Sequence, residues 1–85
     1  MSIKVRFFAS LKEHMGCDSM AVEAVFAPAT LAGLTAYLQA NNPQFAQALG
    51  EVGRVRAAVN HDMAEDSTLV PPGAEVAYFP PVTGG

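Results

Sequence analysis

Two stretches at opposite ends of the chain alternate with the period of a β-strand, and they constrain the fold more than any other feature. From Ile3 to Phe8 one face is entirely apolar, and Phe8 falls on the other face, beside two cations. Glu75 to Phe79 alternates in the same way, with Phe79 on the face opposite Tyr78. A strand with one apolar face must bury that face against another layer. The chain therefore predicts a sheet that is covered on one side.

The segments between these two strands predict the rest of the sheet. Ser19 to Phe26 is expected to form a second strand that runs back beside the first, and Arg54 to Val59 a third. A turn is expected at Asn60 to Asp62, and a weakly patterned stretch starts at Met63. Pro72-Gly73 is a turn signal that precedes the last strand.

One long stretch has helical spacing, with Thr30 as its predicted N-cap and Pro43 as its limit, because the residue before a proline avoids the helical region. Its apolar stripe consists of Leu31, Leu34 and Leu38. Pro43 to Leu49 is expected to be a short apolar turn over an edge of the core. The prediction is an α+β fold, a single domain over residues 1–79 with one main helix packed across one face of the sheet.

A shorter helix is expected after the first strand. Ser10 and Glu13 have the spacing of a capping box, and Gly16 is placed to end the helix.

The charge balance argues against nucleic acid as a partner. The chain has 85 residues, a net charge of −3 and five basic residues, too few to neutralise a run of phosphates. Four of the five lie in two strand segments, which predicts either a small basic patch or solvated strand faces. Neither a signal peptide nor a membrane span is recognisable, so a cytoplasmic location is expected.

Conventional catalytic groups are scarce. His61-Asp62 is expected to form a polar turn, and His14 is expected to lie at the end of a short helix, where a cation is favourable. Cys17 lies beside Asp18, whose negative charge disfavours a reactive thiolate. No metal site is expected.

The last seven residues, FPPVTGG, are the exception. Pro80 and Pro81 stop the final strand and direct the chain into an extended form. Gly84 and Gly85 have no side chains, so the terminal carboxylate can enter a narrow slot. A carboxylate resists nucleophiles and becomes useful only after activation, for example as an acyl adenylate. Residues 80–85 are therefore predicted to be an extended reactive tail.

The stretches FFAS, AAVN and GAEVAYFPPVTGG, together with the order of the strands, resemble the MoaD family, the small sulfur-carrier subunits of molybdopterin synthase. The resemblance covers nearly the whole chain. It implies a β-grasp fold, like that of ubiquitin, in which the first and last strands lie parallel at the centre of the sheet. The runs of two prolines and two glycines in the tail follow the family pattern without a departure.

The resemblance also implies a mechanism. The carboxylate of Gly85 is adenylated by an ATP-dependent activating enzyme, converted to a thiocarboxylate, and used to build the dithiolene of molybdopterin in the large synthase subunit. No cofactor is expected on this chain alone, and a heterotetramer with two large subunits is implied. The residues expected to thread the partner's channel are Pro80, Pro81, Val82, Thr83 and Gly84.

Three apolar residues are candidates for the partner interface. Phe8 and Phe79 lie opposite the predicted core, and parallel terminal strands bring them together. Met63 matches a position where the family places another apolar contact. The alternative for Phe8 is burial under the segment from Pro43 to Leu49.

Two other functions use the same activated glycine. One is a ubiquitin-like modifier that is attached to lysines through isopeptide bonds. The other is the sulfur carrier of the thiamine pathway, although nothing in that reading accounts for the FPPV ending.

Overall fold

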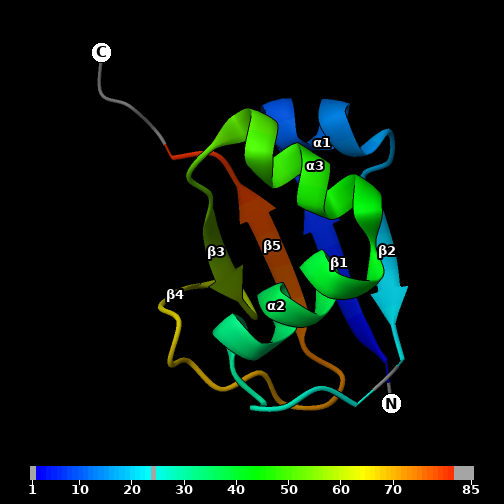
Figure 1. The fold of residues 1–85 in the computed structure, drawn as a ribbon. Helices are drawn as coiled ribbons and strands as arrows, with labels where there is room; N and C mark the ends of the chain where they lie inside the picture. Colours follow the sequence, from blue (N-terminus) through cyan, green and yellow to red (C-terminus); the bar gives the residue numbers. More distant parts are fainter. Residues whose placement is uncertain (1, 24, 82–85) are drawn as a thin grey trace.

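Five strands form one mixed sheet in the order β2-β1-β5-β3-β4 (Figure 1). This computed structural model describes residues 2–23 and 25–81. The first and last strands pair in parallel at the centre, as expected, and the other neighbours are antiparallel. The strands are β1 (Ile3–Phe7), β2 (Ser19–Val22), β3 (Arg56–Val59), β4 (Asp62–Ala64) and β5 (Glu75–Phe79).

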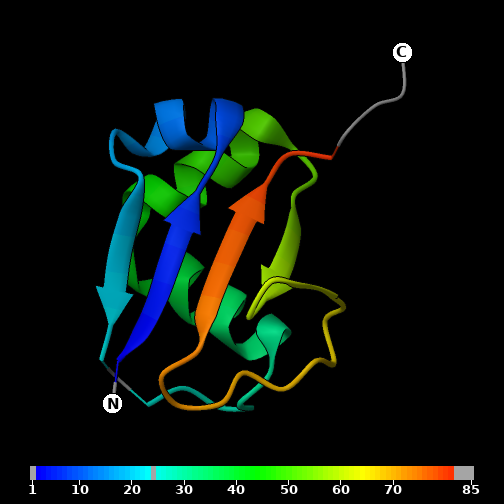
Figure 2. The same ribbon diagram turned by 180° about the vertical axis from the view of Figure 1, so that it is seen from behind.

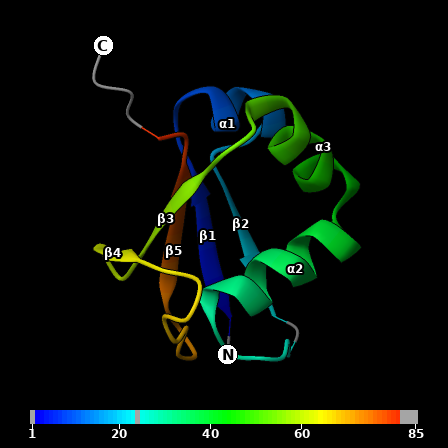
Figure 3. The ribbon, with the colours of Figure 1, turned by 60° about the vertical axis from the view of Figure 1, so that its left-hand side comes forward.

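Helices cover one face of this sheet and leave the other open (Figures 1 and 3). The helices are α1 (Ala9–Met15), α2 (Leu31–Asn41) and α3 (Pro43–Val52). The α+β, β-grasp prediction is confirmed, and the main predicted helix, α2, lies across the sheet. Thr30 caps it as expected, because its side-chain oxygen accepts a hydrogen bond from the backbone N–H of Gly33 at 3.2 Å.

The expectation of a short turn from Pro43 to Leu49 is wrong, because this segment is most of α3. Pro43 ends the preceding helix but also starts the next one, where its missing N–H would have no helical partner. Asn42 caps the new helix, and its Oδ1 accepts a hydrogen bond from the N–H of Phe45 at 3.0 Å. Pro43 therefore both limits α2 and begins α3.

The core lies between the helices and the inward face of the sheet. Its centre is an aromatic cluster in which Phe45 of α3 packs edge-on against Tyr78 at 5.3 Å between ring centroids and lies 6.1 Å from Phe7. The apolar stripe of α2 and the inward residues of β1 and β5 are buried as predicted: Leu31, Leu34, Leu38, Ile3, Val5, Phe7, Val76 and Tyr78.

The expected capping box at Ser10 and Glu13 is wrong. The chain turns sharply at Ala9, whose φ is 54°, and the carbonyl of Phe8 already accepts a hydrogen bond from the N–H of Lys12 at 3.3 Å. Ser10 therefore lies inside the first turn of α1, and the N-cap residue, Phe8, makes no side-chain cap. The end of the helix is as predicted, with Gly16 in the left-handed conformation at φ 74°.

The second strand is shorter than expected. β2 ends at Val22 rather than Phe26, and Val25 is 96% exposed. The chain then crosses close to α2, where a Cβ on Gly33 would lie 1.8 Å from the carbonyl oxygen of Pro28. This approach explains a glycine inside a helix, where it is otherwise unfavourable by about 1 kcal/mol relative to alanine.

The third strand starts at Arg56, two residues later than expected, and leads into a tight hairpin. Asn60 and His61 form its two-residue turn with φ of 50° and 73°, both in the left-handed region. Asp62, expected in the turn, begins β4, and Met63 lies within that strand rather than in an irregular stretch. A three-residue strand is too short to show a period in sequence.

No helix in the described ranges is long and apolar enough to cross a membrane.

Candidate functional site

The base of the tail lies at the C-terminal end of β5, at the same end of the sheet as α1 (Figure 2). The last ladder pair joins Phe79 to Arg56 of β3, and Pro80 follows at once. Proline has no N–H to continue the ladder, so the predicted end of the strand is confirmed. Pro80 and Pro81 are half-buried. The remaining predicted tail residues lie outside the described residues: Val82, Thr83, Gly84 and Gly85.

The open face of the sheet brings together the three apolar residues predicted to form the interface. Phe8 continues the parallel pairing of β1, since its N–H donates to the carbonyl of Tyr78 at 3.1 Å, which places it beside Phe79. Met63 reaches the same face by register, because it pairs with Ala58, which in turn pairs with Ala77. Residues paired directly across strands point to the same face.

Phe8 and Met63 are the exposed members of this group, at 43% and 57%. The alternative position for Phe8, beneath the segment from Pro43 to Leu49, is wrong. Phe45 of that segment packs on Phe7, the neighbour of Phe8 on the opposite face. Two large apolar side chains thus face solvent where the alternation of β1 and the register of β4 place them.

The open face also carries charge. The guanidinium of Arg6 lies over the ring of Phe8, 5.6 Å from its centroid, and donates to Oε2 of Glu75 at 3.3 Å. His61 at the hairpin turn approaches the other oxygen of the same carboxylate at 3.9 Å. Arg56 lies beside Phe79 and is exposed. Lys4, Arg6 and Arg56 fall on this face by strand alternation, whereas Arg54, the fourth basic residue of the two predicted strand segments, precedes β3 and lines a cavity between α2 and β3.

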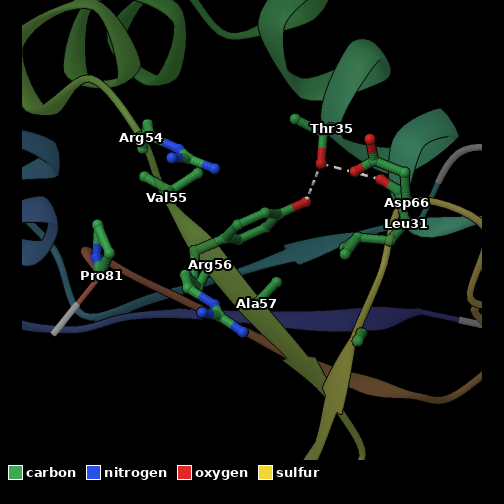
Figure 4. A pocket seen from close by; sticks show the side chains of 10 residues that line it. Leu31, Thr35, Arg54, Val55, Arg56, Ala57, Asp66 and Pro81 are labelled. Carbon is green, nitrogen blue, oxygen red and sulfur yellow. Dashed lines mark hydrogen bonds between the residues drawn. The ribbon is translucent and has the colours of Figure 1, made fainter.

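A cavity of about 300 Å³ opens on the other side of the tail base, between α2 and β3 (Figure 4). Pro81 lines one side, and Thr35 and Asp66 line the other. The hydroxyls of Thr35 and Tyr78 lie 2.7 Å apart. The hydroxyl of Thr35 donates to the carbonyl of Leu31 at 2.9 Å, so its single proton is used and Tyr78 must be the donor of the other bond.

Burial raises the pKa of Tyr78 to about 12, because the phenolate would lose its hydration. The hydrogen bond with Thr35 offsets part of this rise in the pKa of Tyr78, and the negative charge of Asp66 adds to it. Tyr78 therefore stays neutral at physiological pH and holds α2 onto the central strand. Sequence reasoning identified its burial but not its hydroxyl partner, which lies 43 residues away.

The other titratable candidates have the unremarkable positions that their sequence contexts predict. His61 lies at the hairpin turn, and His14 is exposed near the end of α1, where its carbonyl accepts from Gln44. Cys17 is exposed. Among residues 2–23 and 25–81, no group of three or more His, Cys, Asp or Glu side chains is arranged to hold a metal ion. The tail and the open face are the features that point to a function.

Comparisons with known proteins agree with this geometry. The model of the ThiS family matches residues 5–85. The molybdopterin synthase sulfur carrier subunit of Escherichia coli is 42% identical over 83 residues, which cover 98% of this chain and 99% of that protein. The similarity thus extends over the fold and the tail together.

Solved structures show the same fold. SAMP1 from Haloferax volcanii matches with a TM-score of 0.76 and 26% identity, and all of each chain is covered. A chain of the complex of subunits 1 and 2 of the molybdopterin-converting factor from Helicobacter pylori matches with a TM-score of 0.66 and 29% identity, again over all of both chains. From its sequence match, its sheet topology and these neighbours, the chain belongs to the ThiS/MoaD family of β-grasp proteins.

Proposed function

We propose that this protein is the sulfur carrier subunit of a molybdopterin synthase, and that Gly85 carries the sulfur as a thiocarboxylate. The observation that carries the proposal is the 42% identity, over nearly the full length of both chains, to a protein of that name. The ending FPPVTGG supplies the group that this function needs. The two prolines that follow β5 favour delivery of that group away from the sheet.

The chemistry follows from the reactivity of a carboxylate. At pH 7 the terminal carboxylate is anionic and a poor acyl donor. Transfer of an adenylyl group from ATP, with release of pyrophosphate, converts it to a mixed anhydride from which AMP can leave. Hydrosulfide, HS⁻, from a sulfur source displaces AMP, and loss of the proton on its sulfur leaves a thiocarboxylate on Gly85. Its sulfur is an anionic nucleophile near neutral pH, suited to attack on a cyclic pyranopterin precursor. That attack joins Gly85 to the precursor through a thioester, and hydrolysis of its acyl–sulfur bond leaves the sulfur on the precursor and returns the carboxylate.

Two protein partners are part of the proposal. An activating enzyme binds ATP and adenylates Gly85. A large subunit receives the tail and holds the pterin. We place its contact on Phe8, Phe79 and Met63, which share the open face next to the tail base. The assembly with two large subunits is a heterotetramer. In this scheme the small subunit is a sulfur donor within a sulfurtransferase and is not catalytic alone.

Intact-protein mass spectrometry tests the proposal directly. After incubation with the activating enzyme, ATP and a sulfur donor, the wild-type chain is expected to gain about 16 Da, the replacement of one oxygen by sulfur, at Gly85. A variant that lacks Gly85 is expected to show no gain and an unchanged thermal unfolding midpoint. Full sulfur transfer by that variant would contradict the proposal.

A second function, that of a ubiquitin-like modifier, is favoured by one observation. SAMP1, the small archaeal modifier protein 1, has a solved structure that matches this one with a TM-score of 0.76. A modifier forms an isopeptide bond between its terminal glycine and a lysine of another protein. Peptide mapping of cell extract that shows lysine adducts of the Gly-Gly terminus, with no thiocarboxylate, supports this function instead.

A further inference from the structure

The open face carries cations at the positions next to its apolar group. Arg56 pairs with Phe79 across β3 and β5. Arg6 lies in the row that runs through Ala77 and Ala58 to Met63, since each residue pairs with the next. Ala77 and Ala58, in the middle of this row, have small side chains that do not protrude from the sheet between Arg6 and Met63. The apolar group and the two arginines therefore form one continuous surface, which we call the open-face patch (Phe8, Phe79, Met63, Arg6 and Arg56).

The charge of this face is opposite to that of the whole chain. The net charge of the protein is −3. Among the outward-facing residues of β1, β3 and β5, Lys4, Arg6 and Arg56 are accompanied by one carboxylate, that of Glu75. Asp62 in β4 pairs with Val59, whose side chain points to the core, so it belongs to the other face. The outward-facing residues of these three strands thus carry more positive than negative charge, although the protein as a whole is acidic.

Docking through Phe8 and Met63 would bury the arginines beside them. The side chain of Arg6 is 42% exposed, and it already shares the carboxylate of Glu75. Arg56 makes no ion pair with any of the residues that the structure describes. A guanidinium that loses water without gaining an acceptor is strongly destabilising, and that penalty would oppose the apolar contact. A partner that covers this patch must therefore supply acceptors to it.

We infer that the open-face patch docks on a protein surface that carries carboxylates around an apolar centre, and that Arg6 and Arg56 select this partner and steer its approach. The inference rests on the proposed function, in which the large synthase subunit is the partner. Opposite charges on two docking surfaces raise the association rate more than they prolong the complex, and added salt screens the effect. Phe8 and Met63 make the apolar contact, whereas the two arginines raise the association rate and select the partner.

The test is the association rate of the full-length chain with its large subunit, measured by stopped-flow fluorescence at low and at high ionic strength. The variant Arg6→Leu/Arg56→Leu is expected to associate roughly tenfold more slowly than wild type at low salt, with the difference largely lost at high salt. Lys12→Leu is the matched control, because it removes a charge from α1 rather than from the open face. Its rate is expected to stay within about twofold of wild type.

A second variant separates charge from packing. Arg6→Lys/Arg56→Lys keeps both charges and is expected to retain the association rate within about twofold. Equal rates for the leucine double variant and the Lys12 control overturn the inference while leaving the carrier function in place, as does a deficit that high salt does not reduce. Failure of the wild-type chain to bind the large subunit overturns both. Arg56→Leu alone, at an exposed position without an intramolecular ion pair among the described residues, gives the same comparison without disturbing Phe8.

Discussion

The two faces of the sheet are built from the same strands, but one is closed by the helices and the other exposes apolar side chains. On the covered face, Phe7, Tyr78 and Phe45 pack into a closed aromatic cluster. On the open face, Phe8 and Met63 are exposed. Successive residues point to the two faces in turn, so Phe7 lies in the core while Phe8, the next residue, is exposed on the open face. A small domain can therefore leave one face of its sheet open, with apolar side chains exposed on it, and still keep a continuous core.

Removal of one phenylalanine from each face tests this difference between the faces most directly. Phe45→Ala is expected to lower the free energy of unfolding by about 3–5 kcal/mol, because it leaves a cavity in the closed cluster. Phe8→Ala removes only an exposed ring and its contact with Arg6, so a loss under about 1 kcal/mol is expected. Urea denaturation measures both values.

For affinity, the two variants are expected to rank in the opposite order to their effects on stability. Phe8→Ala is expected to weaken the complex with the large subunit at least roughly tenfold, as truncation of an aromatic residue at an interface often does. Isothermal titration calorimetry at a temperature well below the unfolding transition measures this affinity. Similar stability losses for the two variants, or unchanged affinity for Phe8→Ala, would show that the division between the faces is wrong.

The covered face can be probed by pH through Tyr78, whose pKa is raised to about 12 by burial. In the unfolded chain a tyrosine titrates near pH 10, so between these values the unfolded state has lost a proton that the folded state keeps. Stability is complete below about pH 10 and falls as the pH rises towards 12, by up to about 3 kcal/mol.

Tyr78→Phe is the control for that measurement, since it keeps the ring and removes the titrating group. Urea denaturation from pH 9 to 12 is expected to show a smaller decline for this variant than for wild type. Parallel declines would mean that the phenol is not protected by burial against α2.

The smallest expected effects separate α2, which covers the sheet, from α1, which follows Phe8. Thr30→Ala removes a side-chain cap and is expected to lower the unfolding free energy by about 1 kcal/mol. Ser10→Ala is expected to change it by less than about 0.5 kcal/mol, because Ser10 makes no cap. Thermal unfolding of both variants beside wild type detects the difference. If Ser10→Ala lowered the unfolding free energy as much as Thr30→Ala, Ser10 would have to cap α1 after all.

Patterns confined to a few consecutive residues were predictable from sequence. Alternation places Phe7 and Phe8 on opposite faces without knowledge of any neighbour, since the side-chain period of a strand is two. The cap at Thr30 and the left-handed Gly16 are equally local. The ending FPPVTGG predicts a stiff base and a tip without side chains, because proline and glycine restrict or free the backbone by their own covalent structure.

Features that depend on pairs distant in sequence were not predictable in this way. The contact of Arg6 with Glu75 joins residues 69 positions apart, and that of Thr35 with Tyr78 joins residues 43 apart. The open-face patch exists only because parallel pairing of β1 with β5 sets Phe8 beside Phe79, and because the hairpin brings Met63 to the same face of the sheet. The alternation of each strand, set by its own residues, determined which side chains share a face. The tertiary structure alone decided which of them meet, because strand order and register arise from the packing of the whole core.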